Sequence, residues 1–93
     1  MIERTAGGLR VTAPMIVPNA AALLASGLDL IHEATETVDL SAVIEADSSA
    51  LAVMLGWLRA AAASGRELAF SHPPAGIQAL ADLYGISTLL PLR

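Results

Sequence analysis

Apolar residues recur along the chain at two spacings, one typical of helices and the other of strands. From Pro18-Asn19 onward, apolar or small residues repeat every three or four positions, which predicts a helix with one apolar face. The residues on that face are Ala20, Leu23, Leu24, Gly27, Leu28 and Ile31. A second helix is predicted from Ser48 or Ser49 to Ser64, ended by Gly65, and a third over Ala75–Tyr84, ended by Gly85.

Short runs of strand-forming residues lie between these helices. Met1–Thr5 and Leu9–Thr12 flank Gly7-Gly8, a strong hairpin-turn signal. Two further strands are predicted at residues 37–40 and 67–71. Because strands then alternate with helices, the pattern favours parallel strand–helix–strand units. The sequence therefore predicts a single α/β domain over residues 1–93, with a mixed sheet of about four strands, an N-terminal hairpin and three flanking helices.

The composition is unusually apolar. Hydrophobic residues make up 55% of the chain and charged residues 15%, with a mean hydropathy of +0.63, whereas ordinary domains carry about 25% charged residues. Such a chain is expected either to bury apolar surface against a partner or to span a membrane. The uncharged run Ser48–Leu58 is too short to span, since a spanning helix needs roughly 20 residues. With no recognisable signal peptide either, we expect a cytoplasmic protein without a membrane span.

Several classes of chemistry lack the residues that they require. Cysteine is absent, which removes disulfides and thiolate chemistry. The net charge is −4 and the five basic residues are scattered, which argues against nucleic-acid binding. His32 and His72 do not form a recognisable metal site with the scattered carboxylates, and no phosphate-loop, dinucleotide or nucleophile-elbow motif is present. We therefore expect no enzymatic activity, no cofactor and no metal.

The stretch "EADSSALAVMLGWL", residues 45–58, combines a polar start with a strongly apolar helix. Asp and Ser are favoured helix caps, so Asp47-Ser48-Ser49 is expected to cap the helix through a serine. One apolar stripe suits a sheet-facing surface and contains Leu51, Met54, Leu55, Leu58 and Ala62. A second stripe is displaced around the helix and contains Ala50, Val53, Trp57 and Ala61.

A surface helix needs only one apolar face, so the second stripe calls for a further contact. The favoured interpretation is a protein partner anchored on Trp57, because tryptophan is enriched at interface hot spots. The alternative is that Trp57 packs beneath the C-terminal tail. The sequence leaves open whether the isolated chain forms a homodimer through this stripe. In either case the turn at residues 41–47 follows a predicted parallel strand, at the sheet edge where α/β proteins place functional sites.

The segments "VDLSAVIEADSSALAVML" and "GRELAFSHPPAGIQALADLYGISTLLPL" resemble a STAS domain over nearly the whole chain. The ending "LADLYGISTLLPLR" is similar to the STAS subunits of Mla-type phospholipid ABC transporters. This resemblance implies a non-catalytic, cytoplasmic subunit, peripheral to the inner membrane, that binds the transporter's ATPase subunit and supports its assembly and activity. The transporter would move phospholipid between the two membranes and maintain outer-membrane lipid asymmetry.

The resemblance also assigns roles to the two serines. In the transporter subunits the hydroxyl residue directly after Asp contacts the partner, which corresponds to Ser48. In anti-sigma factor antagonists the phosphorylated serine corresponds to Ser49, and with Ser48 beside it both hydroxyls are candidates for phosphorylation. The alternative function is therefore a phosphorylation-regulated anti-sigma factor antagonist. Ala50 stands where the family usually has Gly. The predicted partner-binding residues are Asp47, Ser48, Ala50, Leu51, Val53, Met54 and Trp57.

Overall fold

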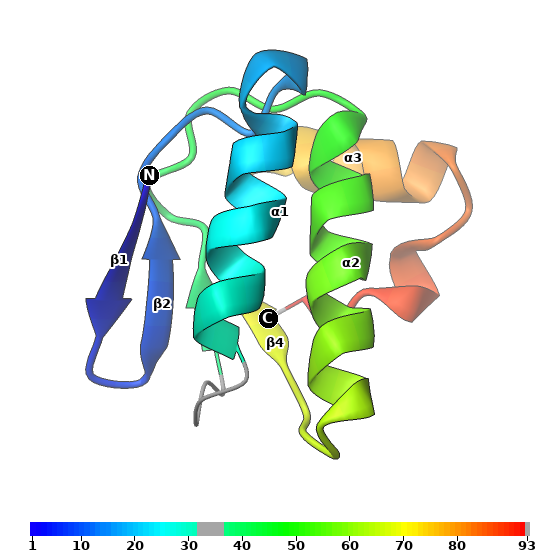
Figure 1. Ribbon diagram of the computed structural model, residues 1–93. Coiled ribbons are helices and arrows are strands. Elements are labelled where there is room, and N and C mark those ends of the chain that lie inside the picture. The colour runs from blue at the N-terminus through cyan, green and yellow to red at the C-terminus, as the bar shows by residue number, and fades with distance from the viewer. Residues whose placement is uncertain (32–36, 93) are drawn as a thin grey trace.

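The computed structural model describes residues 1–31 and 37–92, which form a sheet with helices packed against it (Figure 1). The strands are β1 (Ile2–Thr5), β2 (Gly8–Val11), β3 (Thr37–Asp39) and β4 (Ala69–Ser71). The helices are α1 (Val17–Ile31), α2 (Ser49–Ala63) and α3 (Ala75–Leu83), followed by a short 3-10 turn at Ser87–Leu89. His32 and Arg93 lie outside the described residues.

The strands pair in the order β1-β2-β3-β4. The β1–β2 hairpin is antiparallel, whereas β2, β3 and β4 run parallel to one another. These pairings confirm the predicted mixed sheet and N-terminal hairpin. Within the described residues the sheet has four strands and three α-helices accompany it, as the alternating pattern indicates.

The strand register separates an apolar face of the sheet from a polar one. Leu9 pairs with Val38, and Val38 pairs with Phe70, and all three side chains are buried. The next residue of β2 and of β3, Arg10 and Asp39, points to the opposite face, because side chains alternate along a strand. The apolar face therefore supplies the floor of the core.

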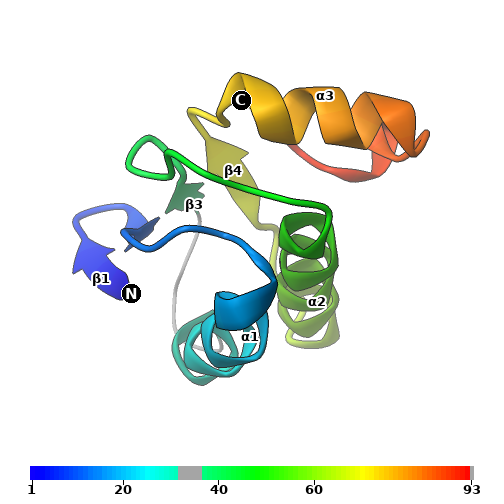
Figure 2. The same ribbon diagram turned by 90° about the horizontal axis from the view of Figure 1, so that it is seen from above.

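Two of the helices cover the apolar face of the sheet. α1 and α2 lie side by side on it, whereas α3 lies at the β4 end and runs crosswise to them (Figures 1 and 2). No helix among the described residues has the length and apolar character needed to cross a membrane. The core lies between the sheet, α1 and α2, and α3 adds Ile77 and Ala81 to it.

The contact between α1 and α2 explains the second apolar stripe of α2. Trp57 is 1% exposed, and its indole Nε1 donates a hydrogen bond of 3.3 Å to the carbonyl oxygen of Leu24 in α1. The other members of the stripe, Ala50, Val53 and Ala61, are buried as well. The interpretation that this stripe needs an external partner is therefore wrong, since the stripe is buried within the chain and Trp57 packs against α1. A helix in this layer touches both the sheet and its neighbouring helix, so it needs two apolar faces.

Gly27 allows the indole of Trp57 to lie directly against the backbone of α1. A Cβ atom built on Gly27 would overlap the Trp57 ring, whereas one built on Gly56 would lie 2.7 Å from Cδ1 of Leu24, the end of a flexible side chain. The two glycines therefore provide a matched pair for testing how tightly the helices pack.

We expect Gly27→Ala to lower the free energy of unfolding by about 2 kcal/mol, because overpacking exceeds the gain in helix propensity. Gly56→Ala is expected to change it by less than about 1 kcal/mol, because the Leu24 side chain can rotate away. Urea denaturation of both variants measures the difference. Equal stabilities for the two variants would contradict the close packing of Trp57 on Gly27.

Candidate docking site at the starts of α1 and α2

The carboxylate of Asp47 connects the first turns of two helices. Its Oδ1 accepts hydrogen bonds from the backbone N–H of Ser49, at 2.9 Å, and from the Ser49 hydroxyl. Its Oδ2 accepts a hydrogen bond from the backbone N–H of Val17, also at 2.9 Å. Val17 is the first residue of α1 and Ser49 the first of α2. One side chain therefore satisfies N–H groups that the first turn of a helix leaves without a backbone partner.

The main chain brings the same two segments together. The N–H of Met15 donates to the carbonyl of Glu45 at 2.9 Å, and the N–H of Asp47 donates to the carbonyl of Met15 at 3.1 Å. Met15 and Ala46 thereby form a parallel bridge, with the Met15 side chain buried in the core. The starts of α1 and α2 consequently lie together at one end of the molecule, the upper end in Figure 1.

These hydrogen bonds favour the charged form of Asp47. Its pKa is lowered from the usual value, chiefly by the bond from the Ser49 hydroxyl and then by the backbone N–H of Val17. The carboxylate therefore stays ionised and keeps both of its oxygens as acceptors across the neutral pH range. Its negative charge also lies at the starts of two helices, where the helix dipole stabilises it.

The two serines occupy different environments. Ser48 precedes α2 in a helical backbone conformation, makes no side-chain capping hydrogen bond and is exposed. Ser49 is partly buried, and its hydroxyl is bound to Asp47. The expectation that a serine caps α2 through its side chain is therefore wrong, because the Asp47 carboxylate takes that role. Ser48 is therefore exposed at the tip of the helix, whereas the hydroxyl of Ser49 is held by Asp47.

Most of the predicted partner-binding residues serve the core of the chain itself. Ala50, Leu51, Val53, Met54 and Trp57 are each at most 4% exposed. Hydrophobic spacing alone does not distinguish a helix packed against two neighbours in its own chain from one that docks on another protein. The structure leaves Ser48 exposed and Asp47 partly exposed.

Two apolar side chains at this end are exposed and were not singled out by the sequence pattern. Ile44, in the loop between β3 and α2, is 93% exposed, and Val17, at the start of α1, is 67% exposed. Periodicity could not identify them, because Ile44 lies in a loop and Val17 begins a helix. The loop "SAVIEADSS" holds two adjacent large apolar residues, Val43 and Ile44, and nothing in the sequence tells which of them is exposed.

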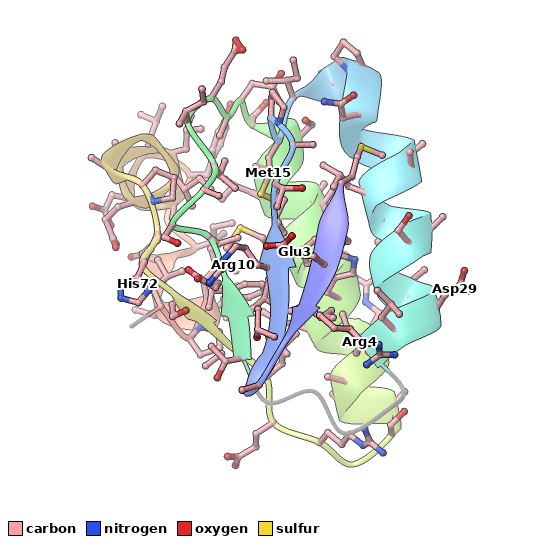
Figure 3. All side chains as sticks on the ribbon, turned by 90° about the vertical axis from the view of Figure 1, so that its left-hand side faces the viewer. Glu3, Arg4, Arg10, Met15, Asp29 and His72 are labelled. Atoms are coloured by element: carbon pink, nitrogen blue, oxygen red, sulfur yellow. The ribbon has the colours of Figure 1, made fainter. Side chains whose placement is uncertain are left out.

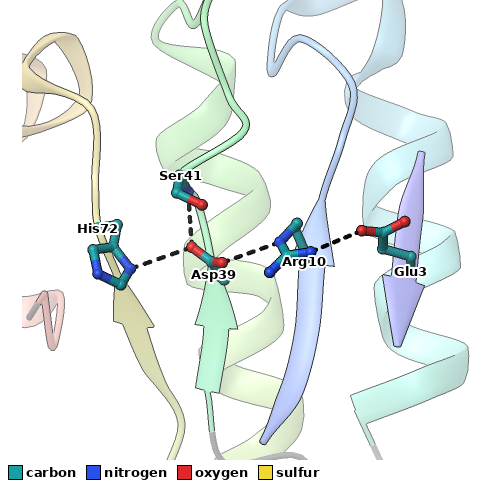
Figure 4. Close-up of polar contacts among 5 residues, drawn as sticks. All are labelled: Glu3, Arg10, Asp39, Ser41 and His72. Atoms are coloured by element: carbon teal, nitrogen blue, oxygen red, sulfur yellow. Dashed lines mark hydrogen bonds and ion pairs between the residues drawn. The ribbon is translucent and has the colours of Figure 1, made fainter. Parts of the chain in front are cut away.

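A row of polar side chains crosses the sheet on the face turned away from α1 and α2 (Figure 4). Arg10 lies in its middle, with Nε 3.1 Å from Oδ2 of Asp39 and Nη1 3.1 Å from Oε1 of Glu3. Nδ1 of His72 lies 3.4 Å from Oδ1 of Asp39. Figure 3 shows Glu3, Arg10 and His72 on this side of the sheet, while Arg4 points toward α1. No three His, Cys, Asp or Glu side chains among the described residues are grouped closely enough to hold a metal ion.

Asp39 is the most strongly perturbed carboxyl in this row. Its pKa is lowered from 3.8 to about 2, mainly because the backbone N–H of Ser41 donates to it at 2.9 Å, with further hydrogen bonds from the Ser41 hydroxyl and Arg10. Since the folded-state pKa is below the unfolded one, the stabilisation is complete above about pH 3.8 and disappears as the pH falls toward 2. The row therefore links β1, β2 and β3 electrostatically and fixes the loop that leaves β3.

We expect Asp39→Asn to lower the free energy of unfolding near neutral pH by about 2 kcal/mol, the value of the pKa shift. The variant should also lose less stability than the wild type when the pH falls from about 4 to about 2, because no carboxylate remains there to be protonated. Urea denaturation across this pH range measures both effects, with the exposed Glu67→Gln as control. A variant with the wild-type acid dependence would contradict this role of Asp39.

The fold is that of a small α/β domain, and the end where α1 and α2 begin, with Val17, Ile44, Asp47 and Ser48, is its candidate docking end. The chain belongs to the STAS domain family: the family model described as "Mlab, STAS domain" matches residues 2–91. Proteins of this family are generally non-catalytic regulatory or binding modules that act through protein–protein interaction. The particular branch is the MlaB-type branch that gives the family model its name.

The fold is also similar to a solved structure with a very different sequence. A crystallised protein from Thermotoga maritima, assigned as an anti-sigma factor antagonist, superposes with a TM-score of 0.78 at 16% sequence identity. The match covers 99% of this chain and 83% of that one. Identity this low establishes the shared fold alone. No curated protein sequence matches the chain.

Proposed function

We propose that this chain is the non-catalytic STAS subunit of an ABC-type phospholipid transporter, and that it binds the transporter's ATPase subunit on the cytoplasmic side of the inner membrane. In this role it supports assembly and ATPase activity, and so contributes to lipid transport between the membranes and to outer-membrane lipid asymmetry. The match to the MlaB-type family model supports the transporter assignment. The observation that supports the docking position is the exposed Ser48 hydroxyl at the end where α1 and α2 begin.

The geometry suits docking because the exposed hydroxyl lies on a rigid support. Asp47 holds the start of α2 to the start of α1, and the Met15–Ala46 bridge holds the two approaching segments together. A preorganised surface loses little conformational freedom when it binds, which favours affinity. The buried side chains of α2 contribute indirectly, because they fix the helix that presents Ser48.

We expect Ser48→Asp to weaken binding to the cognate ATPase subunit at least tenfold, because it introduces a charge and extra volume at the contact. The fold should remain intact, since Ser48 is exposed and Asp is a favoured residue before a helix. Calorimetric titration measures the affinity, with thermal denaturation as the check on folding. Gln78→Glu, an exposed charge change on α3, is the matched control and should bind as the wild type does. Wild-type affinity for folded Ser48→Asp would contradict docking through this end.

A second candidate function is a phosphorylation-regulated anti-sigma factor antagonist, and the Ser49 contact supports it. A phosphoryl group on Ser49 would replace the hydroxyl proton donated to Asp47 with a group carrying about −1.5 to −2 charges. Repulsion from the carboxylate would then alter the same docking end. Intact-mass analysis of protein from its native host, with and without phosphatase, tests this function. A chain that is never modified and binds no kinase-type anti-sigma factor would rule it out.

A further inference from the structure

We propose that Ile44 and Val17 are the apolar anchors of the docking end, and that its acidic character selects a partner surface in which an apolar pocket is bordered by basic side chains. This inference rests on the proposed function, since it concerns the same end of the molecule as Ser48. It adds the residues that provide the contact and the chemistry of the surface that receives them.

The loop that carries Ile44 is held in place on both sides. Leu40 and Val43, just before it, are buried, and Glu45 and Asp47, just after it, are hydrogen-bonded to Met15 through the backbone. Ile44 is nevertheless 93% exposed, the highest exposure of any large apolar side chain among the described residues. A side chain this exposed on an anchored loop is available to enter an apolar pocket of a partner with little rearrangement of the loop.

Val17 is a second exposed apolar side chain, at the start of α1. Its side chain is 67% exposed, and its backbone N–H is bound to Oδ2 of Asp47. The Ile44 loop and the start of α1 therefore lie at the same end of the molecule, with Ser48 adjoining Asp47 (Figure 1). The end thus combines two exposed aliphatic side chains with one exposed hydroxyl.

The charged side chains of the two segments that form this end have one sign. Residues 11–19 and 40–52 contain two charged side chains, Glu45 and Asp47, and no Lys, Arg or His. Arg10 in β2 is bound to Glu3 and Asp39 on the sheet face, and His72, which follows β4 and adjoins the start of the Ile44 loop, lies within ion-pair distance of the same Asp39. Electrostatic complementarity consequently favours a partner with Arg or Lys at the rim of its apolar pocket.

The same charges argue against two other occupants of this end. In a two-fold contact centred on this end, the Glu45 and Asp47 side chains of both copies would be brought close together, and like charges in contact are unfavourable. An anionic lipid surface would be repelled, because binding to such membranes relies on basic residues. A basic-rimmed protein surface therefore remains the occupant that fits both the apolar and the acidic groups.

The test is a titration of the purified cognate ATPase subunit with the wild type, Ile44→Ser and Leu83→Ser, at low and at high ionic strength. Leu83 is the control, since it is 76% exposed but lies at the end of α3. We expect Ile44→Ser to weaken binding at least tenfold and Leu83→Ser to leave it unchanged. We also expect wild-type binding to weaken with salt, and Glu45→Lys to weaken it at low salt with little effect at high salt.

The outcomes separate this inference from the proposed function. If the wild type binds but Ile44→Ser binds equally well, or if binding is insensitive to salt and to Glu45→Lys, the inference is overturned while the proposed function stands. If the wild type does not bind the ATPase subunit, the proposed function fails and the inference falls with it. Analytical sedimentation of the isolated chain tests for a dimer, and flotation with phosphatidylglycerol vesicles tests for binding to an anionic lipid surface. A dimer or a vesicle complex that Ile44→Ser abolishes would also overturn it.

Discussion

The hydrogen bonds of a single carboxylate hold the functional end of this molecule together. Asp47 accepts from Val17 with one oxygen and from Ser49 with the other, so α1 and α2 start from a shared point. Without that link, each first turn would expose N–H groups that only water could satisfy. The Met15–Ala46 bridge supports the same junction through the backbone. Because the exposed residues Val17, Ile44 and Ser48 all lie in or beside the joined segments, their relative positions depend on it.

The packing of α1 on α2 keeps this junction rigid. The Trp57 indole lies against Gly27 and donates a hydrogen bond to the carbonyl of Leu24. The other buried side chains of α2 belong to the same core cluster as those of the sheet. This arrangement accounts for much of the high apolar content of so small a chain, since α2 needs one face for the sheet and another for α1. The fold therefore uses the apolar residues of α2 internally, and the surface that we propose for the partner lies at the helix tip instead of along the helix side.

The sequence predicted the helices and strands well, but it did not predict which of them pack against one another. Alternating strands and helices, the Gly7-Gly8 turn and the glycine stops predicted the mixed sheet and the helix ends, because these depend on local spacing and backbone freedom. The neighbour of Trp57 could not be predicted, because two apolar stripes look the same whether the second contacts α1 or another protein. Asp47 and Ser48 were identified from the motif, but the partner of Asp47 on α1 lies 30 residues away in sequence. Ile44 was missed because a single exposed residue in a loop has no periodicity.

The central claim is that a partner binds the end where α1 and α2 begin and not the side of α2 or the end of α3. Amide hydrogen exchange of the chain, free and bound to the cognate ATPase subunit, tests it most directly. Binding at the starts of α1 and α2 would add protection at residues 15–17 and 41–49, with little change at residues 83–89. Protection confined to residues 83–89, or to the exposed side of α2, would contradict it.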